Sequence, residues 1–216
     1  MRILAIIAAV AITAASVSSC GSGSSAPKTF CDSACLKDTL KFTGTHKLKP
    51  TVFISASNCK PDTIIWSYDG LESSRKTKFE IPAGVIINKD FVRCLFNENK
   101  YAYILYNDCG TGRGFQMKLP YDKAENFVMK SSGINNMDKK FSVADNLVVN
   151  TDRGNIYVED MNTGKKAMMT FGQKVDIDYD AIHEHVDSVN VTDTRIWVKV
   201  KIGDKWEVKE KSIVLE

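Results

Sequence analysis

The sequence has few of the features that mark nucleic-acid-binding, membrane-spanning or hydrolytic proteins. Its 29 Lys and Arg against 26 Asp and Glu give a net charge of only +3, without a dense basic block, which argues against nucleic-acid binding. It lacks the Gly-x-Ser-x-Gly and His-Glu-x-x-His motifs, and three histidines leave few catalytic constellations. The one long apolar run, Ile3 to Val17, is shorter than the roughly 20 residues of a spanning helix. These absences favour a protein that is not an enzyme, although the sequence leaves catalysis open.

The N-terminus carries the clearest signal. Arg2 supplies a positive charge, an apolar run follows, and the small residues Val17-Ser18-Ser19 precede Cys20. This order is typical of a secretory signal peptide. Val17-Ser18-Ser19-Cys20 resembles the lipobox of bacterial lipoproteins, with Val, Ser and Ser in place of the commoner Leu, Ala and Gly.

The resemblance implies cleavage before Cys20, a diacylglycerol on the Cys20 thiol and an acyl chain on its amine, so that the membrane is a partner. Two or three acyl chains suffice for stable anchoring. Gly21 after the cysteine favours the outer membrane of the bacterial envelope, by the sorting habit of this class. Ordinary secretion and an uncleaved anchor are the alternatives.

Three segments follow from this interpretation. Residues 1–19 are the lipoprotein signal peptide, and residues 20–29 are the lipidated cysteine and a flexible tether that contains Gly21-Ser22-Gly23-Ser24-Ser25. Residues 30–216 form a single β-rich domain, long enough for its own hydrophobic core.

The cysteines favour disulfides in an oxidising compartment. With Cys20 lipidated, five cysteines remain, all in the first half of the mature chain, and the odd number leaves at least one unpaired. The spacing of the first two could also form half of a metal site, but nothing nearby completes it. The disulfide candidates, with free buried thiols as the alternative, are Cys31, Cys35, Cys59, Cys94 and Cys109.

Dense strand signals predict an all-β fold. Short runs rich in β-branched and aromatic residues alternate with turn residues such as Gly203-Asp204, and helical periodicity is weak outside a short segment at Phe30–Leu40. The predicted strands are Thr51–Ser57, Thr63–Tyr68, Gly84–Asn88, Phe91–Phe96, Tyr101–Tyr106, Phe115–Leu119, Asn146–Asn150, Asn155–Asp160, Ala167–Phe171, Val186–Val191, Arg195–Ile202 and Trp206–Leu215.

A weak internal repeat bears on how these strands are arranged. Trp66, Tyr103, Tyr157 and Trp197 each follow a polar turn, at intervals of 37, 54 and 40 residues. Such periods resemble the blades of a β-propeller, so a propeller-like antiparallel meander is favoured. A β-sandwich is the alternative, because any meander places aromatics after turns.

Two segments are candidate binding sites. On an extended strand His183 and His185 would share a face, and His46, Asp180 or Asp187 could complete a transition-metal site if the fold brings it near. A calcium-binding loop is less favoured. Ala181 stands where such a loop needs a glycine for its sharp turn, and the twelfth position is Asp187 instead of a glutamate. A solvated strand is the simpler interpretation.

In the second segment the amides of Gly112, Arg113 and Gly114 could cradle an anion, but the apparent strands on either side favour a plain hairpin loop.

The sequence thus predicts a membrane-anchored envelope lipoprotein with a binding or structural role, whose partner is an envelope protein or a small ligand. The alternative is a metal-dependent hydrolase that uses the His-x-His pair. Otherwise no cofactor is expected.

Overall fold

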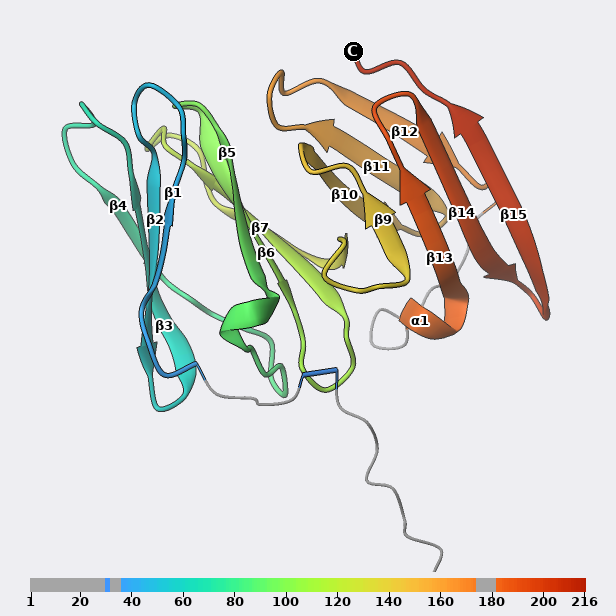
Figure 1. Ribbon diagram of the computed structural model, residues 1–216, viewed down its shortest axis with the longest axis horizontal. Helices are drawn as coiled ribbons and strands as arrows, with labels where there is room; N and C mark the ends of the chain where they lie inside the picture. Colours follow the sequence, from blue (N-terminus) through green and yellow to red (C-terminus); the bar gives the residue numbers. More distant parts are fainter. Residues whose placement is uncertain (1–29, 32–35, 174–181) are drawn as a thin grey trace, which may run out of the picture.

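The computed structural model of the protein describes residues 30–31, 36–173 and 182–216 (Figure 1). The predicted signal peptide, Cys20, Cys35 and Asp180 lie outside these residues. The described part is all-β, as predicted, with three sheets, a 3₁₀ turn at Lys89–Phe91 and one helical turn, α1 (Ile182–His185). None of the described helices is long and apolar enough to cross a membrane.

The first sheet has four antiparallel strands in the order β1-β2-β3-β4. Two of them confirm predicted strands. The short edge strands were not predicted, because β4 contains only polar residues and β1 begins at Leu40, which the predicted helix included. The strands are β1 (Leu40–Thr43), β2 (Thr51–Ser57), β3 (Lys60–Ser67) and β4 (Arg75–Lys78).

The central sheet has seven strands in the order β12-β11-β10-β8-β7-β6-β5, all antiparallel. β6 is buried along its whole length, as expected of a strand with both faces covered. The strands are β5 (Val92–Asn97), β6 (Tyr101–Asn107), β7 (Gly114–Pro120), β8 (Val128–Ile134), β10 (Leu147–Asp152), β11 (Asn155–Asp160) and β12 (Lys166–Thr170).

The third sheet has the order β15-β14-β13-β9, in which β9 pairs parallel to β13. β13 and β14 confirm the predicted bounds, and the alternation in β14 buries Ile196, Val198 and Val200 on one face. The strands are β9 (Phe141–Val143), β13 (Val186–Val191), β14 (Arg195–Ile202) and β15 (Lys205–Ser212).

The sheets pack as two sandwiches that share the central sheet (Figure 1). One core lies between the first sheet and β5–β7, and includes Trp66, Tyr106 and Phe115. The other lies between the third sheet and β10–β12 and includes Ile156 and Val198. The sandwich-like arrangement is therefore the one adopted.

The aromatic repeat does not mark separate blades. Trp66 lies in the first sheet and Trp197 in the third, whereas Tyr103 and Tyr157 share the central sheet. An aromatic after a turn is a local feature of hairpins, so its period does not report how the sheets divide.

Two predicted elements were wrong in the described residues. Residues 84–88 form no strand, because their backbone hydrogen-bonds to the β6–β7 turn and not to a neighbouring strand. The Ile86 amide donates to Asp108 Oδ1 at 2.9 Å, and the Cys109 amide donates to the Ile86 carbonyl at 2.8 Å. The predicted helix at Phe30–Leu40 is not helical in its described residues, and Leu40 already belongs to β1.

Two hairpin loops of the central sheet share one sequence pattern and one set of hydrogen bonds. Residues 108–113 join β6 to β7, residues 160–165 join β11 to β12, and both read Asp-x-x-Thr-Gly-basic. In each loop the Thr hydroxyl donates to the Asp Oδ2 at 2.7 Å, and the Gly amide donates to the Asp carbonyl. Both glycines have positive φ, 77° and 74°. The aspartates therefore hold equivalent turns at two places in one sheet.

Asp160→Asn tests this turn. Burial raises the pKa of Asp160, but hydrogen bonds from the Thr163 hydroxyl, the Asn162 amide and the Asn146 side chain lower it more, so the net shift is downward. A carboxylate with a depressed pKa stabilises the fold above its unfolded pKa, near 3.9, and loses that contribution as the pH falls through the folded value. We expect Asp160→Asn to lower the free energy of unfolding by about 1–2 kcal/mol at neutral pH.

Urea titrations at several pH values provide the measurement. The stability of the wild type should fall faster than that of the variant below about pH 4, because only the wild type has this carboxylate to protonate. Parallel curves would show that Asp160 does not hold the turn. Asp108→Asn should have the same sign, since the pKa of Asp108 is also lowered, by hydrogen bonds that outweigh its burial.

Candidate functional site

The central sheet is rolled so strongly that distant strands meet across its concave face. Four strand steps separate β11 from β6, which is about 19 Å in a flat sheet. Nevertheless the Tyr101 hydroxyl on β6 donates to Glu159 Oε1 on β11 at 2.6 Å, and the Asn97 side chain donates to the Met161 carbonyl. Tyr101, Tyr103 and Met161 belong to a buried cluster separate from the two sandwich cores. The rolled sheet thus encloses a third interior.

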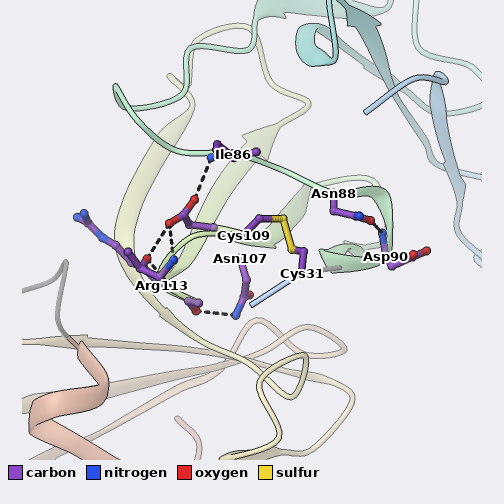
Figure 2. The surroundings of a disulfide bond; sticks show 10 residues. Cys31, Ile86, Asn88, Asp90, Asn107, Cys109 and Arg113 are labelled. Carbon is purple, nitrogen blue, oxygen red and sulfur yellow. Dashed lines mark hydrogen bonds between the residues drawn. A yellow bond between two sulfur atoms is a disulfide. The ribbon is translucent and has the colours of Figure 1, made fainter. Parts of the chain in front are cut away.

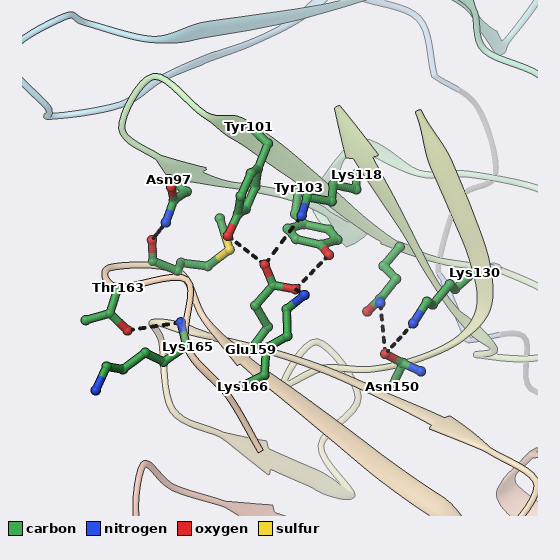
Figure 3. Close-up of polar contacts among 12 residues, drawn as sticks. Asn97, Tyr101, Tyr103, Lys118, Lys130, Asn150, Glu159, Thr163, Lys165 and Lys166 are labelled. Atoms are coloured by element: carbon green, nitrogen blue, oxygen red, sulfur yellow. Dashed lines mark hydrogen bonds and ion pairs between the residues drawn. The ribbon is translucent and has the colours of Figure 1, made fainter. Parts of the chain in front are cut away.

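Glu159 lies at the centre of this interior (Figure 3). Its Oε1 accepts from Tyr101, and its Oε2 accepts from the Tyr103 hydroxyl at 3.2 Å. Lys118 Nζ lies 3.7 Å from Oε1, and Lys166 Nζ lies 3.9 Å from Oε2. The Glu159 side chain is only 12% exposed, so its charge is largely removed from water and depends on these four partners.

The two tyrosines are donors in this arrangement. Burial raises the pKa of Tyr101 and of Tyr103 well above the usual value, and Glu159 raises both further. Their hydroxyls therefore stay protonated at physiological pH and keep donating. Lys118 Nζ also lies 3.7 Å from the centre of the Tyr101 ring, where the ring quadrupole favours a cation.

Glu159→Gln should lower the free energy of unfolding by about 1.5–3 kcal/mol, because it keeps the side-chain volume but leaves half-buried Lys118 without a carboxylate. Urea titration at neutral pH provides the measurement. Glu207→Gln is the matched control: Glu207 also pairs with a lysine, Lys209, at 2.8 Å, but its side chain is 42% exposed, so its loss should cost less than about 0.5 kcal/mol. Equal effects of the two changes would contradict a structural role for the Glu159 cluster.

A polar cavity of about 170 Å³ adjoins Glu159 on the same face. The strand register places its residues in rows: Gln116 lies opposite Lys130, and Asn150 lies opposite Tyr157. Asn150 Oδ1 accepts from Gln116 Nε2 and from Lys130 Nζ, both at 3.2 Å (Figure 3). Gln116 and Asn150 are buried, whereas Lys130 and Lys166 are exposed. The cavity therefore has a buried amide base and lysines at its opening.

In the predicted anion-binding loop, residues 112–114, contacts within the protein explain the position of Arg113 and the need for the two glycines. Arg113 Nε donates to the Ser131 carbonyl at 2.9 Å, and its guanidinium lies 4.8 Å from the centre of the Phe115 ring. Gly112 supplies the positive φ of the turn, and Gly114 begins β7 where β8 passes very close. These contacts place the arginine on the sheet, in a hairpin loop between two strands.

The predicted metal ligands are only partly within the described residues. Asp180 and the His183 side chain lie outside them. The extended backbone assumed for the histidine pair is wrong, because residues 182–185 form α1, and positions two apart on a helix are about 200° apart. Asp187 Oδ2 pairs with Lys199 Nζ at 3.1 Å, which lowers the pKa of Asp187. Among the described side chains, no group of three or more His, Cys, Asp and Glu could hold a metal.

The disulfide candidates divide into bonded and free cysteines. Cys31 and Cys109 form a disulfide across 78 residues, beside the loop that Asp108 holds (Figure 2). Cys59 is also disulfide-bonded, and Cys94 is a free thiol. Burial raises the pKa of Cys94, which favours the protonated thiol over the thiolate. Among the described cysteines, Cys94 is thus an unpaired one of the kind that the sequence leads us to expect.

The residues of the concave face were not identified from the sequence. The run Tyr101-Ala102-Tyr103-Ile104 contains one signal, since a strand with apolar residues on both faces must have both faces covered. Nothing local indicates that Glu159 and Lys166 would cover one of those faces. Comparison of the chain with protein-family models, with curated proteins and with solved structures finds no match.

Proposed function

We propose that this chain is a lipid-anchored protein of the bacterial cell envelope that binds a small polar ligand inside its rolled central sheet. The observation that carries the binding role is the cavity beside Glu159, with buried Gln116 and Asn150 at its base and lysines at its opening. Ligand sites are concave and contain a few convergent polar groups, which this cavity has. The arrangement favours binding over catalysis.

The anchoring role rests on the N-terminal sequence and agrees with the cysteine chemistry. The lipobox-like Val17-Ser18-Ser19-Cys20 follows a charged and then apolar segment. The Cys31–Cys109 disulfide fits an extracytoplasmic compartment, where disulfides persist. The favoured location is the outer membrane.

The disulfide also limits how far the domain can move from the bilayer. Eleven residue steps separate Cys20 from Cys31, which span at most about 40 Å when fully extended. The Phe30 amide donates to the Cys109 carbonyl at 2.8 Å, next to the disulfide. In this proposal the end of the domain with the β6–β7 loop is therefore the end nearest the membrane.

Intact mass of the full chain, purified from bacterial membranes, tests the anchoring. We expect a chain that begins at Cys20 and carries acyl chains, and a Cys20→Ala variant without acyl mass that leaves the membrane fraction. Cys94→Ala is the matched control, because the free thiol of Cys94 has no part in anchoring. A wild-type protein cleaved without acyl chains would overturn the anchored proposal in favour of secretion.

A further inference from the structure

The cavity on the concave face contains an unsatisfied buried acceptor. Gln116 is 2% exposed, and no donor among the described residues reaches its Oε1. The orientation of this amide is fixed by its neighbours: Lys130 can only donate, so it makes Asn150 Oδ1 an acceptor, and Gln116 must then present Nε2 to the same oxygen. Oε1 of Gln116 is therefore left without a donor. Gln116 is one of the residues that line the cavity. A buried acceptor without a donor is costly, and a donor on a molecule in the cavity would offset this cost once a small shift of the Gln116 side chain opens Oε1 to it.

The charges around the cavity are unequal. Lys118, Lys130 and Lys166 surround this interior, and Glu159 is the carboxylate that contacts two of them. Three positive charges against one negative charge leave an excess of two. Lys130 Nζ bonds to the neutral Asn150, and the Lys166 side chain is 64% exposed. Lys130 Nζ therefore keeps two further N–H groups for an anion while it donates to Asn150, and the Lys166 side chain is able to turn onto the same anion at the opening of the cavity.

The size of the cavity restricts the ligand. A volume of about 170 Å³ lies below the range of about 300–1,000 Å³ that is usual for drug-sized ligands. It equals the liquid volume of roughly five or six water molecules. This space suits a molecule of roughly six to ten heavy atoms.

We propose that the cavity binds a small hydroxycarboxylate, with its carboxylate between Lys130 and Lys166 and its hydroxyl donating to Gln116 Oε1. The carboxylate supplies the charge that the lysines lack, and the hydroxyl supplies the donor that the buried amide lacks. This inference rests on the proposed binding function and adds the chemical class of the ligand.

Titration calorimetry of the full-length protein in detergent tests the proposal, with glycerate and malate as probes. We expect binding that weakens with added salt, since the contact is ionic. Propionate, which has no hydroxyl, and glycerol, which has no charge, should each bind at least about tenfold more weakly, because a site built around a hydroxyl or a charge discriminates against analogues that lack it. A saturating probe should also raise the Tm by roughly 5 °C or more.

Three variants separate the site from general electrostatic attraction. Lys166→Gln should weaken glycerate binding about tenfold or more, whereas Lys165→Gln, on the exposed neighbouring position of the same hairpin, should leave it unchanged. Gln116→Met keeps a similar volume and removes the unsatisfied acceptor. It should weaken binding by a similar factor while the Tm stays within a few degrees of the wild type, which a merely structural glutamine would not do.

Three results would overturn the proposal: no heat signal with glycerate or malate up to about 10 mM, glycerol binding as tightly as glycerate, or equal losses from Lys165→Gln and Lys166→Gln. The intact mass of the same preparation reports anchoring independently. A lipidated protein that binds neither probe would refute the ligand class alone, and an unlipidated protein that binds glycerate would refute the anchor alone.

Discussion

Replacing Cys31 and Cys109 together with alanine should lower the free energy of unfolding by about 2–5 kcal/mol. The disulfide joins residues 78 positions apart, and the stabilisation expected from restricting the unfolded chain grows with the length of the closed loop. The closed loop includes the whole first sheet and strands β5 and β6. Few single changes in this chain should cost as much.

Urea unfolding followed by tryptophan fluorescence measures this loss. The double variant is preferable to either single one, because a single change leaves a free thiol that could exchange with the disulfide of Cys59. Cys94→Ala is the control: it removes a thiol that is in no disulfide, and should cost about 1 kcal/mol or less. A double variant that unfolds at the same urea concentration as the wild type would show that the disulfide adds nothing to the closed loop.

Gly114→Ala should lower the free energy of unfolding by about 3 kcal/mol or more. A Cβ at this position would lie 2.0 Å from the carbonyl oxygen of Gly133, where β7 and β8 shift register, and a backbone oxygen cannot rotate away. Such irregularities increase the local bend of a sheet, and this one lies between β7 and β8, on the path from β6 to β11. The expected result is a large fall in the urea midpoint.

Gly110→Ala is the matched control in the preceding loop. Its Cβ would lie 3.3 Å from Asp108 Oδ2, a side-chain atom that can shift by a few tenths of an ångström, so the cost should stay below about 1 kcal/mol. If Gly114→Ala unfolded at the same midpoint as Gly110→Ala, the close approach of β7 and β8 would not be what requires glycine.

The strands were largely predictable because strand formation is a local matter. Alternating apolar and polar residues in Arg195–Ile202, and the Gly203-Asp204 turn after them, specify a strand and a hairpin within a few residues of one another. The predicted strand at Gly84–Asn88 was wrong because a contact with a distant residue decides the conformation of this segment. There the Ile86 amide bonds to Asp108, 22 residues away, which no pattern within residues 84–88 reveals.

The concave site depended on contacts that no local pattern contains. Tyr101 and Glu159 are 58 residues apart and meet because seven strands roll together. β9, only three residues long, joins the third sheet by a parallel pairing with β13, a non-local contact of the same kind. The predicted anion site, in contrast, drew on a single short segment of the chain, and the predicted metal site rested mainly on residues 180–187.

The order of residues therefore accounts for the all-β class and for the positions of most strands, since each depends on neighbours along the chain. The lipobox-like N-terminus is also a local pattern, and the envelope location that it indicates stays a prediction. The sandwich arrangement, the interior around Glu159 and the unsatisfied oxygen of Gln116 arise from strand order and sheet curvature. These depend on the balance of packing between distant segments, which becomes definite only when the whole sheet has formed.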